Sequence, residues 1–300
     1  NLAINYVSAK QLNIEHGKIT GVTALDSETG TSWQMDAKVV INATGIFSDV
    51  FRQANNSQIN WKTRTSRGSH IVVAGTPLGA GNALIIPKTS DGRVLFAVPW
   101  KAHTLIGTTD EPTSRPTLHP TPTEQEVSFL IQEAQSTFDL DPQSITSSWA
   151  GLRPLVSRAG KHSTAALSRK HIIDISDNGL ISILGGKWTT CRKMAEDTID
   201  AAIVSHELPR YDCVSKDLKL TEHGALQPLS PVNAAPDSEF SQVMVESCFR
   251  DYYARNADDI LARRTRTSML NTHLANIQGA TTERSIQKLR ASRGESSQII

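Results

Sequence analysis

The spacing of hydrophobic and polar positions predicts β structure at the start of the chain. Residues 2 to 14 alternate apolar and polar side chains, and a similar run follows at Lys18 to Leu25, so we predict strands here, with turns at Gly17 and Gly21. Residues 38 to 42 form a short, mostly apolar run that ends in Ala43-Thr44-Gly45. Such a run predicts a buried parallel strand whose carboxyl end opens into a ligand-facing loop.

Between about residues 69 and 110 the pattern changes to short apolar segments separated by turns. These segments are His70–Val73, Ala83–Ile86, Val94–Val98 and Thr104–Ile106. They predict an antiparallel sheet inserted into an α/β frame. Residues 147 to 156 predict a further strand or loop, and residues 171 to 184 predict a hairpin.

Helical spacing of apolar residues is clearest after Thr123. This residue has the spacing of a capping box with Glu126 and precedes an apolar stripe, which predicts a packing helix that ends before Pro142. A polar, proline-containing connector occupies residues 206 to 237, and we expect the polar tail after Gly279 to be mobile. The other predicted helices span about 189 to 204, 238 to 254 and 257 to 271.

The composition excludes several classes of function. A net charge of +1 over 300 residues gives no field that would attract nucleic acid. The longest apolar runs, such as Leu180 to Leu184, are too short to span a bilayer. Three cysteines without a C-x-x-C pair favour buried thiols in a reducing compartment, and nine histidines without H-x-x-x-H spacing give no support for a metal site.

Three motifs resemble known signals but fail on spacing or context. Gly186-Lys187 lacks both the upstream glycine and the Ser or Thr after the lysine that a nucleoside-triphosphate loop requires. Gly79-Ala80-Gly81 has Leu84 in place of a third glycine and is expected to be a turn. Asn42-Ala43-Thr44 has the form of a glycosylation sequon, but it ends a predicted buried strand.

The segment from Leu180 to Ala201 has the order strand, two glycines, helix. Gly185 and Gly186 allow a close approach of the backbone, and the free N–H groups of a helix that starts near Thr189 favour partial negative charge. In a flavoenzyme this device belongs beside the flavin edge that gains negative charge on reduction. A tight turn before a packing helix is the alternative, and spacing alone does not separate the two.

Three further features carry candidate chemistry, each with a structural alternative. Residues 42 to 45 suit backbone contact with a dinucleotide, but they also fit an ordinary loop. The planar guanidinium of Arg153, in an apolar stretch, suits a phosphate or carboxylate, and a structural ion pair is the alternative. His70 is a candidate for proton transfer if it faces the same cavity as Arg153 and Lys187, and is otherwise structural.

Several of these segments occur together in one family. They are Val39–Gly45 with Ser48-Asp49, Ser66–His70, Gly107–Asp110, Gly151–Leu155, Gly185–Asp197 and Asp258–Arg266. In this order, over about residues 1 to 275, the chain resembles the FAD-dependent, quinone-linked glycerol-3-phosphate dehydrogenases, within the wider D-amino-acid-oxidase-like flavoproteins. The combination of Gly-Leu-Arg-Pro-Leu, Gly-Gly-Lys-x-Thr-Thr and Leu-Ala-Arg-Arg-Thr-Arg is much more specific than any single motif.

The resemblance implies an active site and a cofactor. His70, Arg153 and Lys187 match the family's active-site histidine, arginine and lysine. Arg153 and Lys187 would supply positive charge for the substrate's phosphate and developing oxyanion. His70 would be a candidate for accepting the proton of the C2 hydroxyl. Hydride would pass from substrate C2 to flavin N5, giving dihydroxyacetone phosphate. The residues implied in FAD contact are Tyr6, Val7, Ala43, Thr44, Gly45, Gly185, Gly186, Lys187, Trp188 and Thr189.

The implied fold is mixed α/β with three parts. Residues 1 to 205 would form an FAD-binding, Rossmann-like portion with an antiparallel substrate-domain sheet at about 60 to 155. Residues 206 to 237 would link it to a helical domain at 238 to 300. The family's N-terminal βαβ unit and its G-x-G-x-x-G turn are not in this sequence. We therefore expect a fragment that alone neither holds FAD tightly nor turns over.

The resemblance also implies partners. Glycerol 3-phosphate would be the substrate and a membrane quinone the electron acceptor. A homodimer and peripheral contact with the inner face of a membrane are compatible with it, in the cytoplasm or, in a eukaryote, the mitochondrion. One alternative is a flavoprotein that oxidises an amino or hydroxy acid, with Arg153 binding the carboxylate. Another is a non-catalytic remnant or binding module that keeps the substrate half of the fold.

Overall fold

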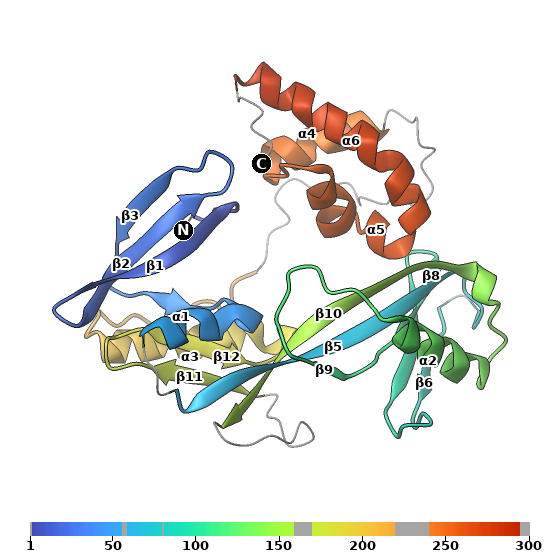
Figure 1. The fold of residues 1–300 in the computed structure, drawn as a ribbon, viewed down its shortest axis with the longest axis horizontal. Helices are drawn as coiled ribbons and strands as arrows, with labels where there is room; N and C mark the ends of the chain where they lie inside the picture. The colour runs from blue at the N-terminus through green and yellow to red at the C-terminus, as the bar shows by residue number, and fades with distance from the viewer. Residues whose placement is uncertain (1, 56–58, 80, 159–169, 220–239, 295–300) are drawn as a thin grey trace.

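The computed structural model describes residues 2–55, 59–79, 81–158, 170–219 and 240–294. The described strands form three sheets, and a separate group of helices follows at the C-terminal end of the chain (Figure 1). This arrangement confirms the mixed α/β fold class predicted from the sequence.

The first sheet is an antiparallel ribbon of three strands. It consists of β1 (Val7–Glu15), β2 (Lys18–Asp26) and β3 (Ser32–Asp36), in that order. Gly17 lies in the predicted turn between β1 and β2, with a φ of 76° that suits glycine. The turn predicted at Gly21 is wrong, because Gly21 lies inside β2 and pairs with both neighbouring strands. All residues of β3 are exposed, so the buried side chains of this sheet come from its first two strands.

The second sheet brings two strand ends together. β11 (His171–Ile175) and β12 (Ile181–Gly185) form the predicted hairpin, and β4 (Ile41–Asn42) runs parallel to β12. The predicted parallel strand is thus present but only two residues long. Ile41 is exposed rather than buried, whereas Asn42 on the same edge strand is buried. The helices that follow these strands are η1 (Gly45–Phe47), α1 (Ser48–Asn55) and α3 (Cys191–Ser205).

The third sheet is antiparallel and contains the longest strands. β5 (Trp61–Ala74) and β10 (Ile145–Arg158) pair along their whole length and run side by side across the molecule (Figure 1). The order of strands is β10-β5-β8-β7-β6, with β9 also paired to β5. The antiparallel sheet predicted between residues 69 and 110 is confirmed, and β5 is much longer than predicted. The remaining strands are β6 (Leu84–Ile86), β7 (Leu95–Trp100), β8 (His103–Gly107) and β9 (Glu111–Thr113).

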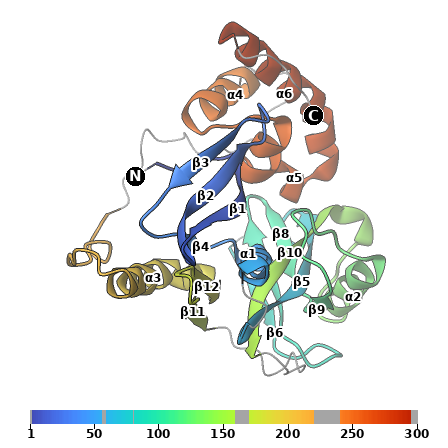
Figure 2. The ribbon, with the colours of Figure 1, turned by 60° about the vertical axis from the view of Figure 1, so that its left-hand side comes forward.

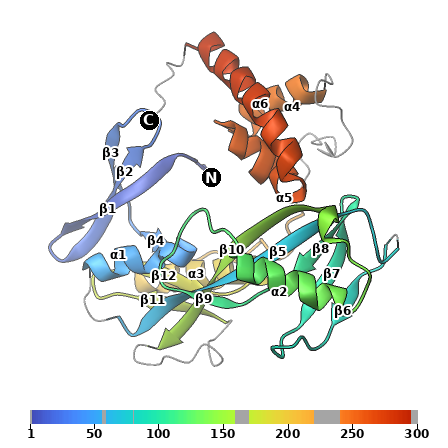
Figure 3. The ribbon, with the colours of Figure 1, turned by 45° about the vertical axis from the view of Figure 1, so that its right-hand side comes forward.

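Helix α2 (Glu124–Gln135) packs on one face of this sheet (Figure 3). The Thr123 hydroxyl accepts a hydrogen bond from the Glu126 backbone N–H, and the Glu126 carboxylate accepts one from the Thr123 N–H, which confirms the predicted capping box. Leu130 and Ala134 are fully buried in the main hydrophobic cluster, together with Ile71 of β5. The short helix η2 (Pro142–Ser144) leads from α2 to β10.

The C-terminal helices differ from the prediction in two respects. The helix predicted over 257 to 271 is divided into η5 (Asp259–Arg264), a π-helix, and α5 (Thr267–Leu270), because Arg266 between them has a φ of 67°. The mobile tail predicted after Gly279 is wrong as far as residue 294, and residues 295–300 lie outside the described residues. Helix α6 (Thr272–Ser292) continues through Gly279, and Ile286 is fully buried against α4 (Phe240–Asp251) in a second hydrophobic cluster.

Two other expectations are partly met. Residues 206–219 carry no helix or strand, and the rest of the predicted connector lies outside the described residues. Cys248 is buried, but Cys191 and Cys213 are exposed, so the prediction of buried thiols is wrong for these two. Within the described ranges, no helix is long and apolar enough to cross a membrane, and no cluster of side chains suits a metal ion.

Candidate active site

His70 lies in the middle of the third sheet, in a row of residues that crosses three strands. Trp149 of β10 and Gly107 of β8 are its partners on either side. The imidazole covers Gly107 so closely that a Cβ there would lie 2.7 Å from Nε2 and 2.8 Å from Cγ of the ring. Only glycine leaves the ring this space, so Gly107 determines where the imidazole lies.

Arg153 is placed over another glycine in the same way. A Cβ at Gly68 would lie 2.6 Å from Cζ and 2.7 Å from Nη1 of the guanidinium. Thr108 Oγ1 accepts a hydrogen bond of 2.9 Å from Nη2, and Asp110 pairs with Nη1 at 3.2 Å. The Arg153 side chain stays about one-third exposed, at 31%, so the guanidinium is fixed and accessible to an anion.

His70 and Arg153 share one face of the sheet. Gly68 and His70 are two residues apart on β5, and side chains two apart on a strand point to the same face. Burial, and to a lesser extent the positive charge of Arg153, lower the pKa of His70 to about 4, although the Gly68 backbone acts in the opposite direction. The imidazole is therefore neutral near neutral pH, and its buried Nδ1 has no hydrogen-bond partner among the described residues.

The turn after β12 has the predicted order of strand, two glycines and helix. Gly185 and Gly186 have φ of 70° and 84°, the short helix η4 (Trp188–Thr190) follows, and α3 begins at Cys191. The two glycines are required by protein neighbours. A Cβ at Gly185 would lie 2.7 Å from Cγ2 of Val156, and one at Gly186 would lie 2.5 Å from Cε of Met194. Trp188 is 89% exposed.

This turn starts beside the strand that carries Arg153. A Cβ at Gly185 would lie 3.8 Å from the carbonyl oxygen of Pro154, the next residue after Arg153. No hydrogen bond or ion pair joins Lys187 to His70 or Arg153 within the described part of the chain. The structure thus places His70 and Arg153 together, whereas the role of Lys187 stays a prediction.

The loop after β4 lies at the same sheet edge as the turn after β12, because the two strands are parallel neighbours. Asn42 is buried, and its Nδ2 donates to the carbonyl oxygen of Ser48, which is inconsistent with glycosylation. The Thr44 hydroxyl donates to Oδ1 of Asn42 at 2.7 Å. Gly45 has a φ of 60° with open space where a Cβ would be, so its backbone is accessible. Ala43 is exposed.

Tyr6 and Val7 lie at the start of β1, away from these two loops. The phenol of Tyr6 donates a 2.7 Å hydrogen bond to Asp259 and accepts one from Nδ2 of Asn256, both in the C-terminal helical region. Burial, together with the hydrogen bond to Asp259, raises the pKa of Tyr6 to about 12. The predicted contact of Tyr6 and Val7 with the adenine side of FAD therefore stays a prediction.

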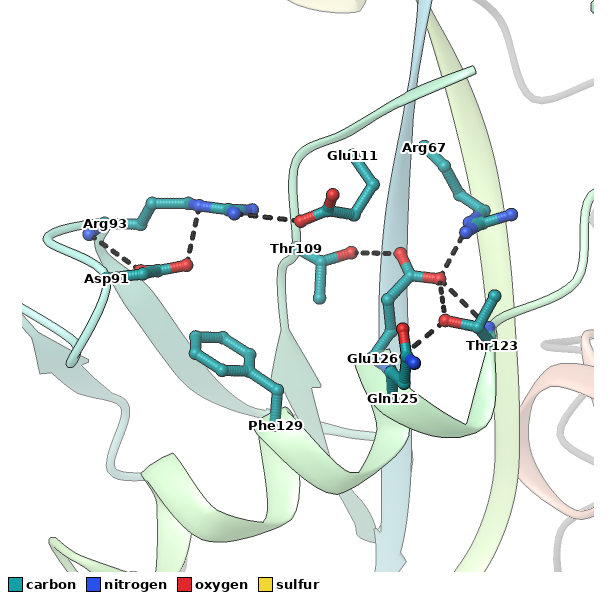
Figure 4. Close-up of a pocket in the computed structure, with 9 residues that line it drawn as sticks. All are labelled: Arg67, Asp91, Arg93, Thr109, Glu111, Thr123, Gln125, Glu126 and Phe129. Atoms are coloured by element: carbon teal, nitrogen blue, oxygen red, sulfur yellow. Dashed lines mark hydrogen bonds and ion pairs between the residues drawn. The ribbon is translucent and has the colours of Figure 1, made fainter. Parts of the chain in front are cut away.

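A separate cavity lies on the opposite face of β5 (Figure 4). It has a volume of about 270 Å³, and Arg67 and Glu126 line it. Arg67 precedes Gly68, so its side chain points away from the face of His70 and Arg153. Its Nε lies 2.8 Å from Oε2 of Glu126, in a geometry that makes the contact an ion pair rather than a hydrogen bond. This cavity belongs to the packing of α2.

Sequence reasoning missed the residues that position His70 and Arg153. Trp149, Thr108 and Asp110 had no assigned role, and neither did the two glycines beneath the functional side chains. The sequence contained one usable signal. Gly68 lies two residues before His70, where the predicted strand begins, and on a strand that extends back to it this glycine leaves a gap on the face that the histidine occupies.

Comparison with known proteins shows which family the chain belongs to. The profile described as "FAD dependent oxidoreductase" matches residues 3–192, and the chain belongs to this family. It is 40% identical over 210 residues to "Glycerol-3-phosphate dehydrogenase, mitochondrial" of Mesocricetus auratus, covering 68% of this chain and 29% of the relative. It is 34% identical to "Probable glycerol-3-phosphate dehydrogenase, mitochondrial" of Caenorhabditis elegans, covering 90% of this chain and 44% of the relative.

A solved structure extends the likeness over nearly the whole chain. The glycerol-3-phosphate dehydrogenase from Bacillus halodurans, complexed with FAD, has a TM-score of 0.76 and 25% identity. The match covers 98% of this chain and 66% of that chain. The chain therefore spans about two thirds of this protein, and less than half of the two curated relatives named above.

Proposed function

We propose that this chain contributes to FAD-dependent oxidation of sn-glycerol 3-phosphate to dihydroxyacetone phosphate. The observation that carries the proposal is the placement of a fixed, accessible guanidinium and a neutral imidazole on one sheet face, beside the Gly185 turn. The names of the relatives support the choice of substrate.

The described residues fit FAD at the edge where β4 and β12 end. In open sheets with parallel strands, ligands bind outside the carboxyl ends of the strands. Here Ala43, Thr44 and Gly45 follow one such end, and the segment from Gly185 to Thr189 follows the other. The N-terminus of the 15-residue helix α3 adds partial positive charge. When bound, FAD supplies the acceptor for the hydride released by the substrate.

Arg153 has the chemistry and the geometry of an anion anchor. Thr108 and Asp110 orient the Arg153 guanidinium, so less conformational entropy is lost when a phosphate binds. We assign the substrate's phosphate to Arg153, with Lys187 as a second cation for the phosphate or the developing oxyanion.

His70 is the group that accepts the proton of the C2 hydroxyl. An imidazole that is neutral near neutral pH has a free lone pair for this purpose. The ring is partly buried, which limits competition from water, and its neighbour Arg153 would hold the hydroxyl-bearing substrate within reach.

The remaining parts of the proposal concern the wider setting. We propose that a quinone takes the electrons, that the chain is part of a homodimer, and that it contacts a membrane only peripherally. The names of the mitochondrial relatives support a mitochondrial location if the source is a eukaryote.

Substrate binding tests the assignment to Arg153. Glycerol 3-phosphate, glycine and lactate are titrated calorimetrically into the chain, its Arg153→Ala variant and an Arg210→Ala control at an exposed site. We expect glycerol 3-phosphate to bind most tightly, and Arg153→Ala to weaken it roughly tenfold to a hundredfold, as expected for loss of a charge-assisted hydrogen bond. Equal loss in the control would contradict the assignment.

Reduction of a dye by a version of the protein that spans the full length of the curated relatives, supplied with FAD, tests the reaction. Oxidation of glycerol 3-phosphate, but not of amino acids, supports the proposal. If the protein oxidises an amino or hydroxy acid but not glycerol 3-phosphate, the result favours an amino-acid or hydroxy-acid oxidising flavoprotein, in which Arg153 binds a carboxylate. A lack of binding of all three compounds in the calorimetric titration would favour a non-catalytic remnant.

A further inference from the structure

The ring of His70 is enclosed on two sides within one row of the sheet. On one side it stacks on the indole of Trp149, with ring centroids 4.3 Å apart and planes inclined by 17°. On the other side it lies over Gly107, where there is no room for a Cβ. Both neighbours are the register partners of His70, so the strand pairing itself brings them there.

Trp149 is suited to this place by its flat face and not by its N–H group. Its Nε1 is buried and has no hydrogen-bond partner among the described residues. An unpaired buried donor is unfavourable, so the hydrogen-bonding capacity of the indole does not explain its presence. A phenylalanine would keep a flat apolar surface against His70 without the unpaired donor.

The charges near His70 do not by themselves account for its neutral state. Arg153 of β10 acts on the ring from the same face, and Asp110, after β8, is paired with Arg153 and offsets part of its charge. β8 itself contributes the uncharged Gly107, while Arg67 and Glu126 lie on the opposite face. Burial is the largest influence on the His70 pKa, and the stacked indole is a surface that provides burial.

We propose that Trp149 is a positioning residue, which holds the His70 imidazole against Gly107 and keeps water from its face so that a neutral ring accepts a proton along one direction. That His70 accepts a proton from the substrate rests on the proposed function. The test of the positioning role does not, because the state of His70 can be measured without flavin or substrate.

The test follows the His70 resonances by NMR while the pH of the chain is varied. His70→Gln identifies the signals among those of nine histidines. The wild-type ring should titrate at about pH 4. In Trp149→Ala the midpoint should rise by at least about one pH unit toward 6.5, because water reaches the ring. Trp149→Phe should restore the low midpoint.

An unchanged or lower midpoint in Trp149→Ala would overturn the proposal, and so would failure of Trp149→Phe to restore it. A lower midpoint would mean that attraction between the indole face and a charged imidazole outweighs exclusion of water.

A second measurement needs no variant at Trp149. Contact with a protonated imidazole quenches indole fluorescence, so emission of the wild type should fall near pH 4, and this change should be missing in His70→Gln. Identical profiles would also overturn the proposal.

Discussion

At the scale of single residues, two glycines determine the geometry of the candidate site. Gly107 and Gly68 leave the space into which the His70 imidazole and the Arg153 guanidinium fit, and neither has a backbone conformation that itself requires glycine. These positions therefore require glycine because of the side chain above each one. The two side chains differ in their surroundings, because the His70 ring is stacked on Trp149 and the Arg153 guanidinium is partly exposed at the end of a long side chain.

Substituting the two glycines should have different consequences. Gly107→Ala should lower the free energy of unfolding by about 1–3 kcal/mol, because the added methyl overlaps a ring that Trp149 prevents from moving. Gly68→Ala should cost less stability but weaken binding of glycerol 3-phosphate, because the guanidinium is displaced. Denaturant unfolding and calorimetric titration measure the two effects.

Gly151→Ala is the matched control for this pair. Gly151 is the register partner of Gly68 on β10, and a Cβ there meets nothing within 4 Å. Its substitution should leave both the free energy of unfolding and ligand binding nearly unchanged. A loss of stability in Gly151→Ala as large as in Gly107→Ala would refute the explanation from side-chain overlap.

The lowered pKa of His70 predicts a dependence of stability on pH. In the unfolded chain the imidazole titrates near 6.5, and in the folded chain at about 4. Between these values the unfolded state binds more protons, so stability falls as the pH falls from 6.5 to 4, by about 3 kcal/mol in total. Urea unfolding across this range should give a smaller decrease for His70→Gln. Parallel curves for the two proteins would contradict it.

At the scale of elements, helix α2 is attached to the sheet through a buried carboxylate. Glu126 is 5% exposed and accepts hydrogen bonds from the hydroxyls of Ser69 and Thr109, in addition to those from Thr123. Figure 4 shows the contacts with Thr109 and Thr123. Burial tends to raise the pKa of Glu126, but these hydrogen bonds outweigh burial and lower it. The residue that caps the helix therefore also connects it to β5.

Glu126→Gln should cost more stability than loss of the cap alone. The amide keeps the size but replaces an acceptor with a donor that faces other donors, so we expect a loss of about 1–3 kcal/mol. Thr123→Ala, which removes one capping hydroxyl, should cost about 1 kcal/mol. Because the folded-state pKa of Glu126 is lowered, its contribution is present above the unfolded pKa and is lost as the pH falls. Unfolding curves of both variants at neutral and acid pH test this order, and equal losses would contradict it.

At the scale of the whole molecule, the C-terminal helices are fixed to the first and third sheets. In Figure 2 the first sheet lies next to the C-terminal helices. Tyr6 contacts Asp259 and Asn256, and Glu28, in the turn between β2 and β3, pairs with Arg255 and Arg290. A second contact joins the third sheet to these helices: the hydroxyls of Thr146 and Ser147 donate to the carbonyl oxygens of Leu270 and Ser268.

Tyr6→Phe should weaken the attachment of the C-terminal helices. It removes one hydroxyl that makes two hydrogen bonds and leaves the buried Asp259 with one donor fewer, so the expected loss is about 1–3 kcal/mol. Thermal unfolding should begin earlier, and limited proteolysis should release the C-terminal helices sooner. Tyr253→Phe, at a 61% exposed position, is the control. Equal effects of the two substitutions would argue against this role of Tyr6.

The sequence predicts elements well where the decisive contacts are local. The capping box of Thr123 and Glu126 is three residues long, and the hairpin of β11 and β12 has its turn between its strands, so both are visible in the sequence. Helix α6 was missed because its polar surface dominates the pattern, and few of its residues, such as Ile286, are buried. Its stability comes from packing on α4, which periodicity within one segment does not reveal.

By itself, the sequence determined the family, the order of the elements and the identity of His70 and Arg153 as candidates, because these depend on motifs and on local patterns. Only the tertiary structure decided that the two side chains share a face, that Gly68 and Gly107 hold them, and that Trp149 covers His70. The reason is physical. These neighbours are brought together by the register of strands far apart in the chain, and register is set by the packing of the whole sheet.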